Sequence, residues 1–328
     1  MWLPARSLFA ALLMSSLASS SAAAGDDTIV LDDLKWIDPA ANRLAALTRA
    51  PSECLVRPSD PELASLIALG RIAFRSPVLL GGIAARSGMS CNTCHRNGHD
   101  NPTFFVAGVS GEAGTVDVTG GLFSRTRDDG DFNPVPIPSL VDAASKPSFG
   151  SVVPKDDLRA FLMAVVMDEF QGQRPSDAVT EGLLAYLKAL RSSACPTPAD
   201  GLAEEPAEEI VSLARDALDL ETVYDTILWG LKRRDVPTAD FALLALRAAL
   251  GRIHQRFSTN ERAADGLLEV SRALTAIRSM LETRPVEASQ ALGQTRDALR
   301  RVIRDLHGRS SKSFYNPEFL GPLLQGAN

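Results

Sequence analysis

The spacing of hydrophobic and polar positions predicts helices along much of the chain. The segment 61-PELASLIALGRIAF-74 is typical of a helix, with Asp60 as its N-cap. Further helices are expected over residues 155–170 and 176–192. Alternating patterns that favour strands are scarce, so we expect a mainly α fold.

Beyond residue 206 the pattern is purely helical. Apolar residues recur in steps of three and four, as on one face of an amphipathic helix. They form two stripes: Leu267, Val270, Leu274, Ile277 and Leu281, then Leu292, Leu299, Val302, Ile303 and Leu306. With segments 207–234 and 238–257, about four helices joined by short turns are expected, which predicts a helical bundle.

The chain divides into two predicted domains. Gly and Pro are concentrated between residues 81 and 154, which predicts long loops there. The stretch 195-CPTPADGLAEEP-206 is typical of a linker. The 328 residues leave room for one loop-rich domain over 25–198 and a helical bundle domain over 199–328.

Residues 1–24 have the features of a secretory signal peptide. Arg6 supplies a positive n-region, and the apolar run from Leu8 to Leu17 is too short to span a bilayer. Small residues at 22–24 suit cleavage. We therefore expect export, most simply into a bacterial periplasm, with no stable membrane span.

The net charge of −6 argues against general nucleic-acid binding. Within the bundle, residues 247–312 carry thirteen Lys and Arg against seven Asp and Glu. This local positive excess is suited to docking an acidic periplasmic redox partner, although solvated helix faces give the same pattern.

The stretch 89-MSCNTCHRNGHDN-101 carries the strongest chemical signal. Two cysteines two residues apart, followed at once by histidine, are found in zinc half-sites, dithiol redox pairs and c-type haem anchors. A structural zinc site needs two further ligands, and no second close cysteine pair exists. No βαβ pattern suggests a thioredoxin-like context. Export and the adjacent histidine favour covalent attachment of one haem c.

In this interpretation each residue of the motif has a role. Cys91 and Cys94 would form thioethers with the two haem vinyl groups, one helical turn apart. His95 would supply the proximal iron ligand. The two remaining cysteines, Cys54 and Cys195, are expected to form a disulfide in an oxidising compartment.

A family resemblance follows from several segments together. The lead-in 68-ALGRIAFRSPVLLGGIAARSGMSCNTCH-95 resembles the haem-motif region of the bacterial di-haem cytochrome c peroxidase and MauG-type family. Asp100-Asn101 with 104-FFVAGVS-110, then 132-FNPVPIPSL-140 and 183-LLAYLKAL-190, resemble the elements that follow it. The likeness covers roughly residues 60–192 and implies a cytochrome c-like domain.

The chain departs from that family in two ways. Members carry two haem motifs, whereas this chain has one. Where the family often supplies a distal Met or Tyr ligand, this chain has 145-SKPSFG-150, and Phe149 cannot ligate iron. The sequence motifs therefore do not identify the distal ligand.

Met163 and Met167 are the leading candidates for the distal iron ligand. The alternative is an iron that has no protein ligand on the distal side. The two methionines stand one helical turn apart in the segment 155–170, although such methionines are more often core residues. Weaker candidates are His99, Lys146, His254 and His307. Met89 is expected on the proximal side.

One of the two arginines Arg125 and Arg127 is expected to pair with a haem propionate, because the guanidinium group binds a carboxylate through two parallel N–H donors. The resemblance makes this pairing plausible, and a surface charge balanced by Asp128 and Asp129 is the alternative.

The sequence favours electron transfer by a periplasmic mono-haem c-type cytochrome. Peroxidase-like chemistry or small-ligand sensing at an open iron is the alternative, and an acid–base group would come from Glu112, Asp117 or Glu169. A scaffold role for the bundle is the third hypothesis.

Overall fold

The computed structural model describes residues 29–150, 152–196, 207–258 and 261–326. Residues 29–196 are called the N-terminal part below, and residues 207–326 the C-terminal part. The predicted signal peptide, residues 1–24, lies outside the described residues. The described chain is mainly helical, as the sequence predicts.

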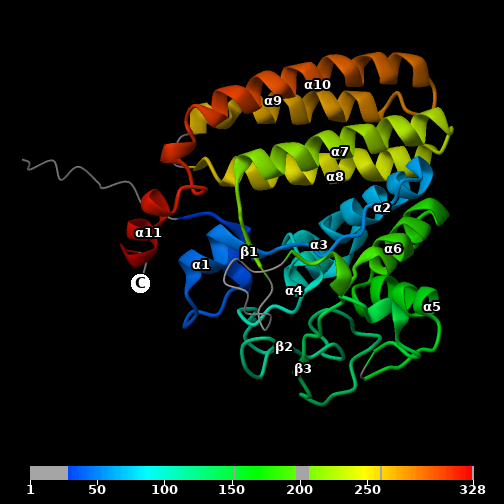
Figure 1. The fold of residues 1–328 in the computed structure, drawn as a ribbon, viewed down its shortest axis with the longest axis vertical. Helices are drawn as coiled ribbons and strands as arrows, with labels where there is room; N and C mark the ends of the chain where they lie inside the picture. The colour runs from blue at the N-terminus through cyan, green and yellow to red at the C-terminus, as the bar shows by residue number, and fades with distance from the viewer. Residues whose placement is uncertain (1–28, 151, 197–206, 259–260, 327–328) are drawn as a thin grey trace, which may run out of the picture.

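Long helices form one side of the molecule and loops the other (Figure 1). The α-helices of the N-terminal part are α1 (Arg43–Thr48), α2 (Pro61–Phe74), α3 (Gly82–Arg86), α4 (Cys91–Cys94), α5 (Leu158–Met163) and α6 (Asp177–Ala189). Those of the C-terminal part are α7 (Leu213–Lys232), α8 (Val236–Gln255), α9 (Glu261–Arg278), α10 (Pro285–His307) and α11 (Pro317–Gly326). Four short strands, β1 (Arg49–Pro51), β2 (Thr115–Val116), β3 (Val135–Pro136) and β4 (Glu208–Ile210), pair antiparallel as β1–β4 and β2–β3.

Helix α2 has the predicted bounds and packs closely on α6. The Asp60 carboxylate caps its N-terminus by accepting from the backbone N–H groups of Glu62 and Leu63. At the crossing, a Cβ atom on Gly70 would lie 1.9 Å from the carbonyl oxygen of Gly182. Only glycine therefore allows this approach of the two helices.

The predicted bundle is formed by α7, α8, α9 and α10, which run side by side (Figure 1). All five residues of the first predicted stripe are buried, and so are Leu292, Leu299 and Leu306 of the second. They join one hydrophobic cluster with apolar residues of α7 and α8. The periodicity therefore identified the bundle core correctly.

The helix predicted over 155–170 is not regular. Helix α5 ends at Met163, and residues Ala164–Glu169 form a π-helix, in which the Phe170 N–H donates to the Val165 carbonyl five residues back. The Gly172 N–H donates to the Val166 carbonyl six residues back, a wider step than that of a π-helix. The chain then leaves the helix, with a positive φ of 54° at Gln171. The wide turn changes which side chains of this segment share a face.

The first and last described segments pack on each other. Leu31, Ile37 and Leu47 share a hydrophobic cluster with Phe314 and Leu320. Strand β1 of the N-terminal part also pairs with β4, which precedes the bundle. Helix α11 was not predicted. Within the described residues, no helix is long and apolar enough to cross a membrane.

A buried charge network also joins the two parts. The Glu53 carboxylate lies 2.7 Å from Arg71 Nε and 3.2 Å from Arg75 Nη2, both on or beside α2. The Tyr186 hydroxyl of α6 donates to it at 2.7 Å. Both arginines also contact Asp219 of α7, at 2.6 and 3.0 Å. We call these five residues the Glu53 network.

Candidate functional site

The cysteine-histidine motif is built on the single turn of helix α4. Ser90 caps this turn, and its own N–H donates to the Thr93 hydroxyl at 3.0 Å, which makes a capping box. Residues three apart on a helix lie on the same face. The turn therefore directs the side chains of Cys91 and Cys94 to one side.

The loop after the motif returns to fix its conformation. The Asn101 amide donates to the Thr93 carbonyl at 2.9 Å, and the Leu140 N–H donates to the Gly98 carbonyl at 2.8 Å. Asn101 and Leu140 belong to the segments that carry the family resemblance. These segments, far apart in sequence, meet at the motif.

The His95 ring has a defined orientation and tautomer. Its Nδ1 lies 2.9 Å from the Pro138 carbonyl oxygen. A carbonyl can only accept, so Nδ1 carries the proton and donates, and Nε2 of the neutral ring keeps its lone pair. Burial lowers the pKa of His95 to about 4, which keeps the ring neutral at physiological pH. A histidine held in this way presents Nε2 as a metal ligand.

Cys91 and Cys94 are free thiols in apolar surroundings. Both are partly buried and pack against the hydrophobic cluster of the N-terminal part. Burial raises the pKa of Cys91 to about 12 and that of Cys94 further. Redox-active and zinc-binding cysteines need an environment that favours the thiolate. The described residues also hold no group of three or more His, Cys, Asp or Glu suited to a metal ion.

The residues present fit a covalently attached haem. Cys91 and Cys94, each only partly buried as a residue, pack against a hydrophobic cluster that includes Phe104, Val109 and Ile137. A large macrocycle with an apolar body matches such surroundings. The neutral Nε2 of His95 matches its iron.

The two methionine candidates are in different surroundings. Met167, in the π-helix, packs against the same cluster as both cysteines. Met163, at the end of α5, is not part of that cluster. π-Helical turns are frequent at functional sites. The geometry therefore favours Met167 over Met163.

Arg127 is paired with a buried carboxylate. Its Nη1 lies 2.6 Å from Glu169 Oε2, and the residue Glu169 is 7% exposed. Burial raises the pKa of Glu169 to about 7, although Arg127 opposes the shift. The charge of Glu169 also acts on the pKa values of both cysteines, so it lies within electrostatic reach of the motif.

The sequence did not reveal this pair, because its members are 42 residues apart. Arg127 contacts Glu169 rather than Asp128 or Asp129, its suggested surface partners. Arg125 is exposed and forms no ion pair with another described residue.

The other predicted candidates lie outside this site or remain ordinary surface residues. Glu112 and Lys146 are exposed, and the buried Asp117 accepts from the Thr119 hydroxyl. His254 and His307 lie on bundle helices α8 and α10. Met89 is the exception, since it is buried in the same hydrophobic cluster that both cysteines pack against, and Phe149 stacks on Phe161.

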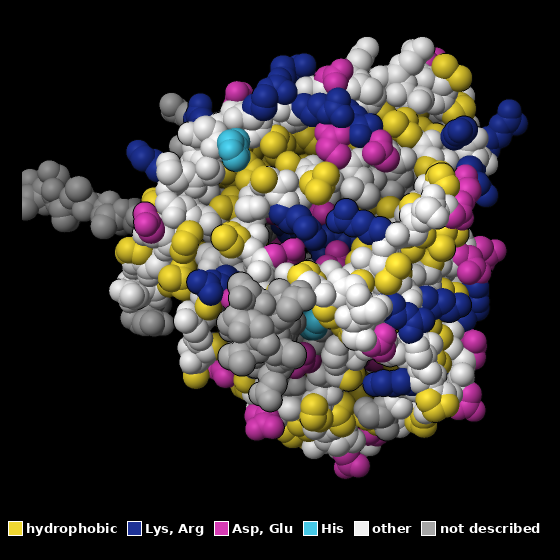
Figure 2. Space-filling view, in the orientation of Figure 1, with side chains coloured by type: hydrophobic (Ala, Val, Ile, Leu, Met, Phe, Trp, Pro, Cys, Tyr) yellow, Lys and Arg dark blue, Asp and Glu magenta, His cyan; other side chains and the backbone are white. Residues whose placement is uncertain are grey.

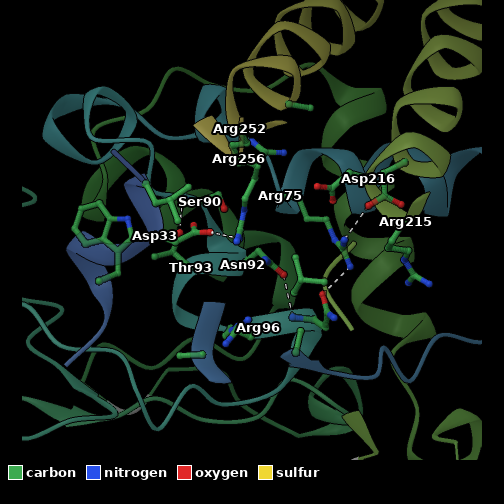
Figure 3. A pocket seen from close by; sticks show the side chains of 18 of the residues that line it. Asp33, Arg75, Ser90, Asn92, Thr93, Arg96, Arg215, Asp216, Arg252 and Arg256 are labelled. Carbon is green, nitrogen blue, oxygen red and sulfur yellow. Dashed lines mark hydrogen bonds and ion pairs between the residues drawn. The ribbon is translucent and has the colours of Figure 1, made fainter. Parts of the chain in front are cut away.

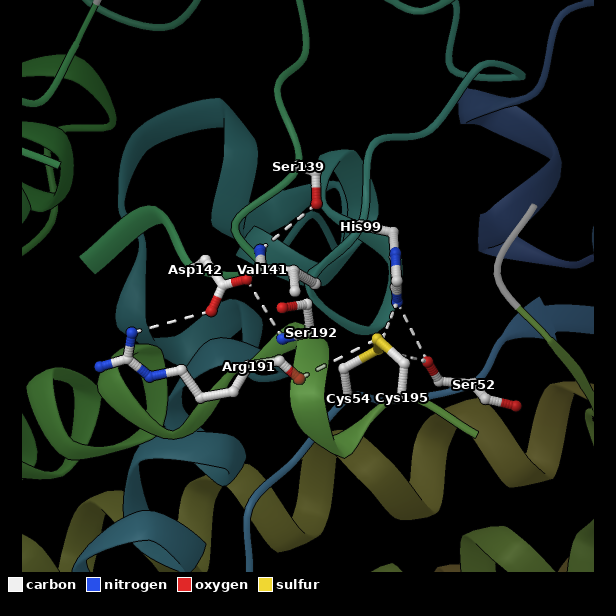
Figure 4. Close-up of a disulfide and its surroundings, with 9 residues drawn as sticks. All are labelled: Ser52, Cys54, His99, Ser139, Val141, Asp142, Arg191, Ser192 and Cys195. Atoms are coloured by element: carbon white, nitrogen blue, oxygen red, sulfur yellow. Dashed lines mark hydrogen bonds and ion pairs between the residues drawn. A yellow bond between two sulfur atoms is a disulfide. The ribbon is translucent and has the colours of Figure 1, made fainter. Parts of the chain in front are cut away.

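The predicted disulfide between Cys54 and Cys195 is present (Figure 4). His99 lies beside it, with Nε2 3.6 Å from Cys54 Sγ and 3.0 Å from the Ser52 carbonyl oxygen. The carbonyl accepts, so Nε2 carries the proton. His99 Nε2 is therefore already engaged in a hydrogen bond beside the disulfide.

Comparison with known proteins identifies no relative. No family model, no curated protein and no solved structure matches this chain.

Proposed function

We propose that this protein is an exported mono-haem c-type cytochrome that transfers electrons. The hydrogen bond from His95 Nδ1 to the Pro138 carbonyl carries the proposal, because it leaves the Nε2 lone pair available on the histidine that directly follows the Cys91–Cys94 pair, whose thiols lie in apolar surroundings. When bound, the haem supplies one-electron redox chemistry.

The protein would hold and orient the haem. Cys91 and Cys94 would attach it, and His95 would be held at a fixed angle by Pro138. Met167 is the candidate for the opposite side of the iron. The Cys54–Cys195 disulfide supports the proposed periplasmic location, since such bonds persist in oxidising compartments.

Covalent attachment is the first experiment. The protein is co-expressed with a c-type maturation system, denatured in acid and acetone, and examined by absorption of its pyridine complex. Haem that stays with the polypeptide supports the proposal. A Cys91→Ala/Cys94→Ala variant is the control, and its haem should be extracted. Extraction of haem from the wild type as well would overturn the proposal.

A second function, peroxide chemistry or small-ligand binding, is favoured by one observation. The buried Glu169, paired with Arg127, is a carboxyl group beside the motif that is able to exchange a proton near neutral pH. The family resemblance also carries this alternative.

Carbon monoxide separates the two functions. If Met167 occupies the distal position of the iron, carbon monoxide should not change the absorption spectrum of the ferrous wild type. The Met167→Ala variant should bind carbon monoxide readily. Met163→Ala is the matched control and should behave as the wild type. Immediate binding by the wild type would favour the second function, with peroxide turnover as its assay.

A further inference from the structure

A polar cavity of about 210 Å³ lies between the two parts of the protein. It opens as a hollow in the surface where Lys and Arg side chains gather (Figure 2). The N-terminal part contributes Ser90, Asn92 and Thr93 from the haem-motif turn. Five arginines line the cavity: Arg75, Arg96, Arg215, Arg252 and Arg256.

Four carboxyl groups also line the cavity, and two of them are neutralised by arginines at the wall. Asp33 lies 3.1 Å from Arg256 Nη2, and Asp219 lies 3.0 Å from Arg75 Nη1. Since the residue Arg256 is only 7% exposed, this pair forms part of the wall. These contacts leave little uncompensated negative charge here.

The other two carboxyl groups are similarly engaged. Glu209 lies 3.4 Å from Arg215 Nη1 and accepts from the Asn97 amide at 2.9 Å. Asp216 accepts a hydrogen bond from the Tyr315 hydroxyl. Burial raises the pKa of Asp216, which reduces its tendency to carry charge.

Two arginines remain without a carboxylate partner within the described parts of the chain. Arg96 and Arg252 make no ion pair there within 4 Å. Arg96 donates one hydrogen bond to the Arg49 carbonyl at 2.7 Å. In the view of Figure 3, Arg252 lies above and Arg96 below, with Asn92, Thr93 and the Asp33–Arg256 pair between them. Two cationic groups thus face one polar space from two walls.

We propose that this cavity binds a small dianion of the phosphate or short-chain dicarboxylate class. Arginine binds both carboxylate and phosphate through paired N–H donors. The polar side chains of Ser90, Asn92 and Thr93 would supply further hydrogen bonds. Pockets for drug-sized ligands run from roughly 300 to 1,000 Å³, so this smaller cavity is of a size that suits a small anion.

Calorimetric titration of the complete protein tests the site. Sodium phosphate and sodium succinate are the probes, with sodium chloride of equal ionic strength as the blank. Saturable heat with phosphate alone would identify a tetrahedral oxyanion, and heat with succinate alone a dicarboxylate. No saturable heat with either probe would overturn the proposal.

Variants locate the binding. Arg252→Gln should weaken it about five- to tenfold, since an exposed charged hydrogen bond is lost. Adding Arg96→Gln should weaken it further. Arg272→Gln is the matched control, because Arg272 is exposed on α9 and does not line the cavity. Equal affinity of Arg252→Gln and Arg272→Gln, both with wild-type unfolding temperatures, would place the ligand elsewhere and refute the assignment.

The site has a consequence that rests on the proposed function. Asn92 and Thr93 stand between the two cysteines, and Arg96 follows His95 directly. A bound anion would favour the more positive, ferric state and lower the haem potential. Redox titration with and without the binding probe should show this decrease in the wild type, and no decrease in Arg252→Gln/Arg96→Gln. Calorimetry does not depend on haem chemistry, so failure of binding and failure of the proposed function remain distinguishable.

Discussion

Replacing Glu53 by Gln should destabilise the protein more than any comparable change of a surface carboxylate. The side chain of Glu53 is 5% exposed and lies within 3.2 Å of both Arg71 and Arg75. Glutamine keeps the shape and an acceptor for the Tyr186 hydroxyl, but it removes the charge. The variant therefore isolates the electrostatic contribution of the Glu53 network.

The pKa of Glu53 gives the magnitude. Burial alone would raise it, but Arg75 and Arg71 outweigh burial and lower it from 4.5 to about 2. A difference of this size corresponds to about 3 kcal/mol of folding free energy. The usual cost of breaking a buried ion pair, about 3–5 kcal/mol, is consistent with it. Asp219 still neutralises part of the arginine charge, which favours the lower value.

The pH dependence provides a second signature. Because the folded-state pKa of Glu53 is depressed, its stabilisation is complete above pH 4.5 and is lost as the pH falls toward 2. Urea unfolding followed by circular dichroism should give a difference of about 3 kcal/mol between wild type and Glu53→Gln at pH 7. About half of that difference should remain at pH 3.

Glu62→Gln is the matched control. Glu62 pairs with Arg233 at 3.1 Å, but both side chains are more than half exposed. Its loss should change the unfolding free energy by less than about 1 kcal/mol. The reasoning is refuted if Glu53→Gln costs no more than this control at pH 7, or if its cost is the same at pH 7 and pH 3.

Three further substitutions test other parts of the structure by urea unfolding. Gly70→Ala should destabilise the protein by about 2 kcal/mol or more, because the added Cβ would lie 1.9 Å from the carbonyl oxygen of Gly182. Gly251→Ala is the control on α8, where the added Cβ meets open space, and it should be neutral or stabilise the protein by up to about 1 kcal/mol. Cys195→Ser should cost about 5 kcal/mol in the chain-entropy description of a 141-residue separation, and a loss below 1 kcal/mol would contradict it. Arg127→Leu should cost only about 1 kcal/mol or less at pH 7, because the buried Glu169, whose pKa is already about 7, can take up a proton when its cation is removed, and a cost of about 3 kcal/mol or more would show that Glu169 stays charged.

The helices that the sequence predicted correctly depend on local signals. The bounds of α2 follow from an N-cap aspartate, an N1 proline and an apolar run, all within fifteen residues. The bundle stripes follow from periodicity alone. The disulfide was also predictable, because only Cys54 and Cys195 remain outside the closely spaced Cys91–Cys94 pair.

The features that the sequence did not reveal depend on residues far apart in the chain. Glu53 and Asp219 are 166 positions apart by number and meet only through the arginines at the end of α2. The π-helix replaces a predicted α-helical turn because the backbone beyond Glu169 leaves the helix at Gln171. The hydrophobic periodicity of the sequence does not predict such contacts, because their members come together only in the folded chain.

The contact between the first and last described segments bears on the order in which the protein is assembled. Leu31 and Leu47 are translated early, but their apolar partners Phe314 and Leu320 emerge last. During synthesis the apolar surface of the leading segment would therefore remain uncovered until nearly the whole chain had followed. In the proposed cytochrome, haem attachment at the motif would then precede the contact between the two ends of the described chain. A chain cut at the linker would leave that early segment exposed and prone to aggregation, and the two halves should be produced as one polypeptide.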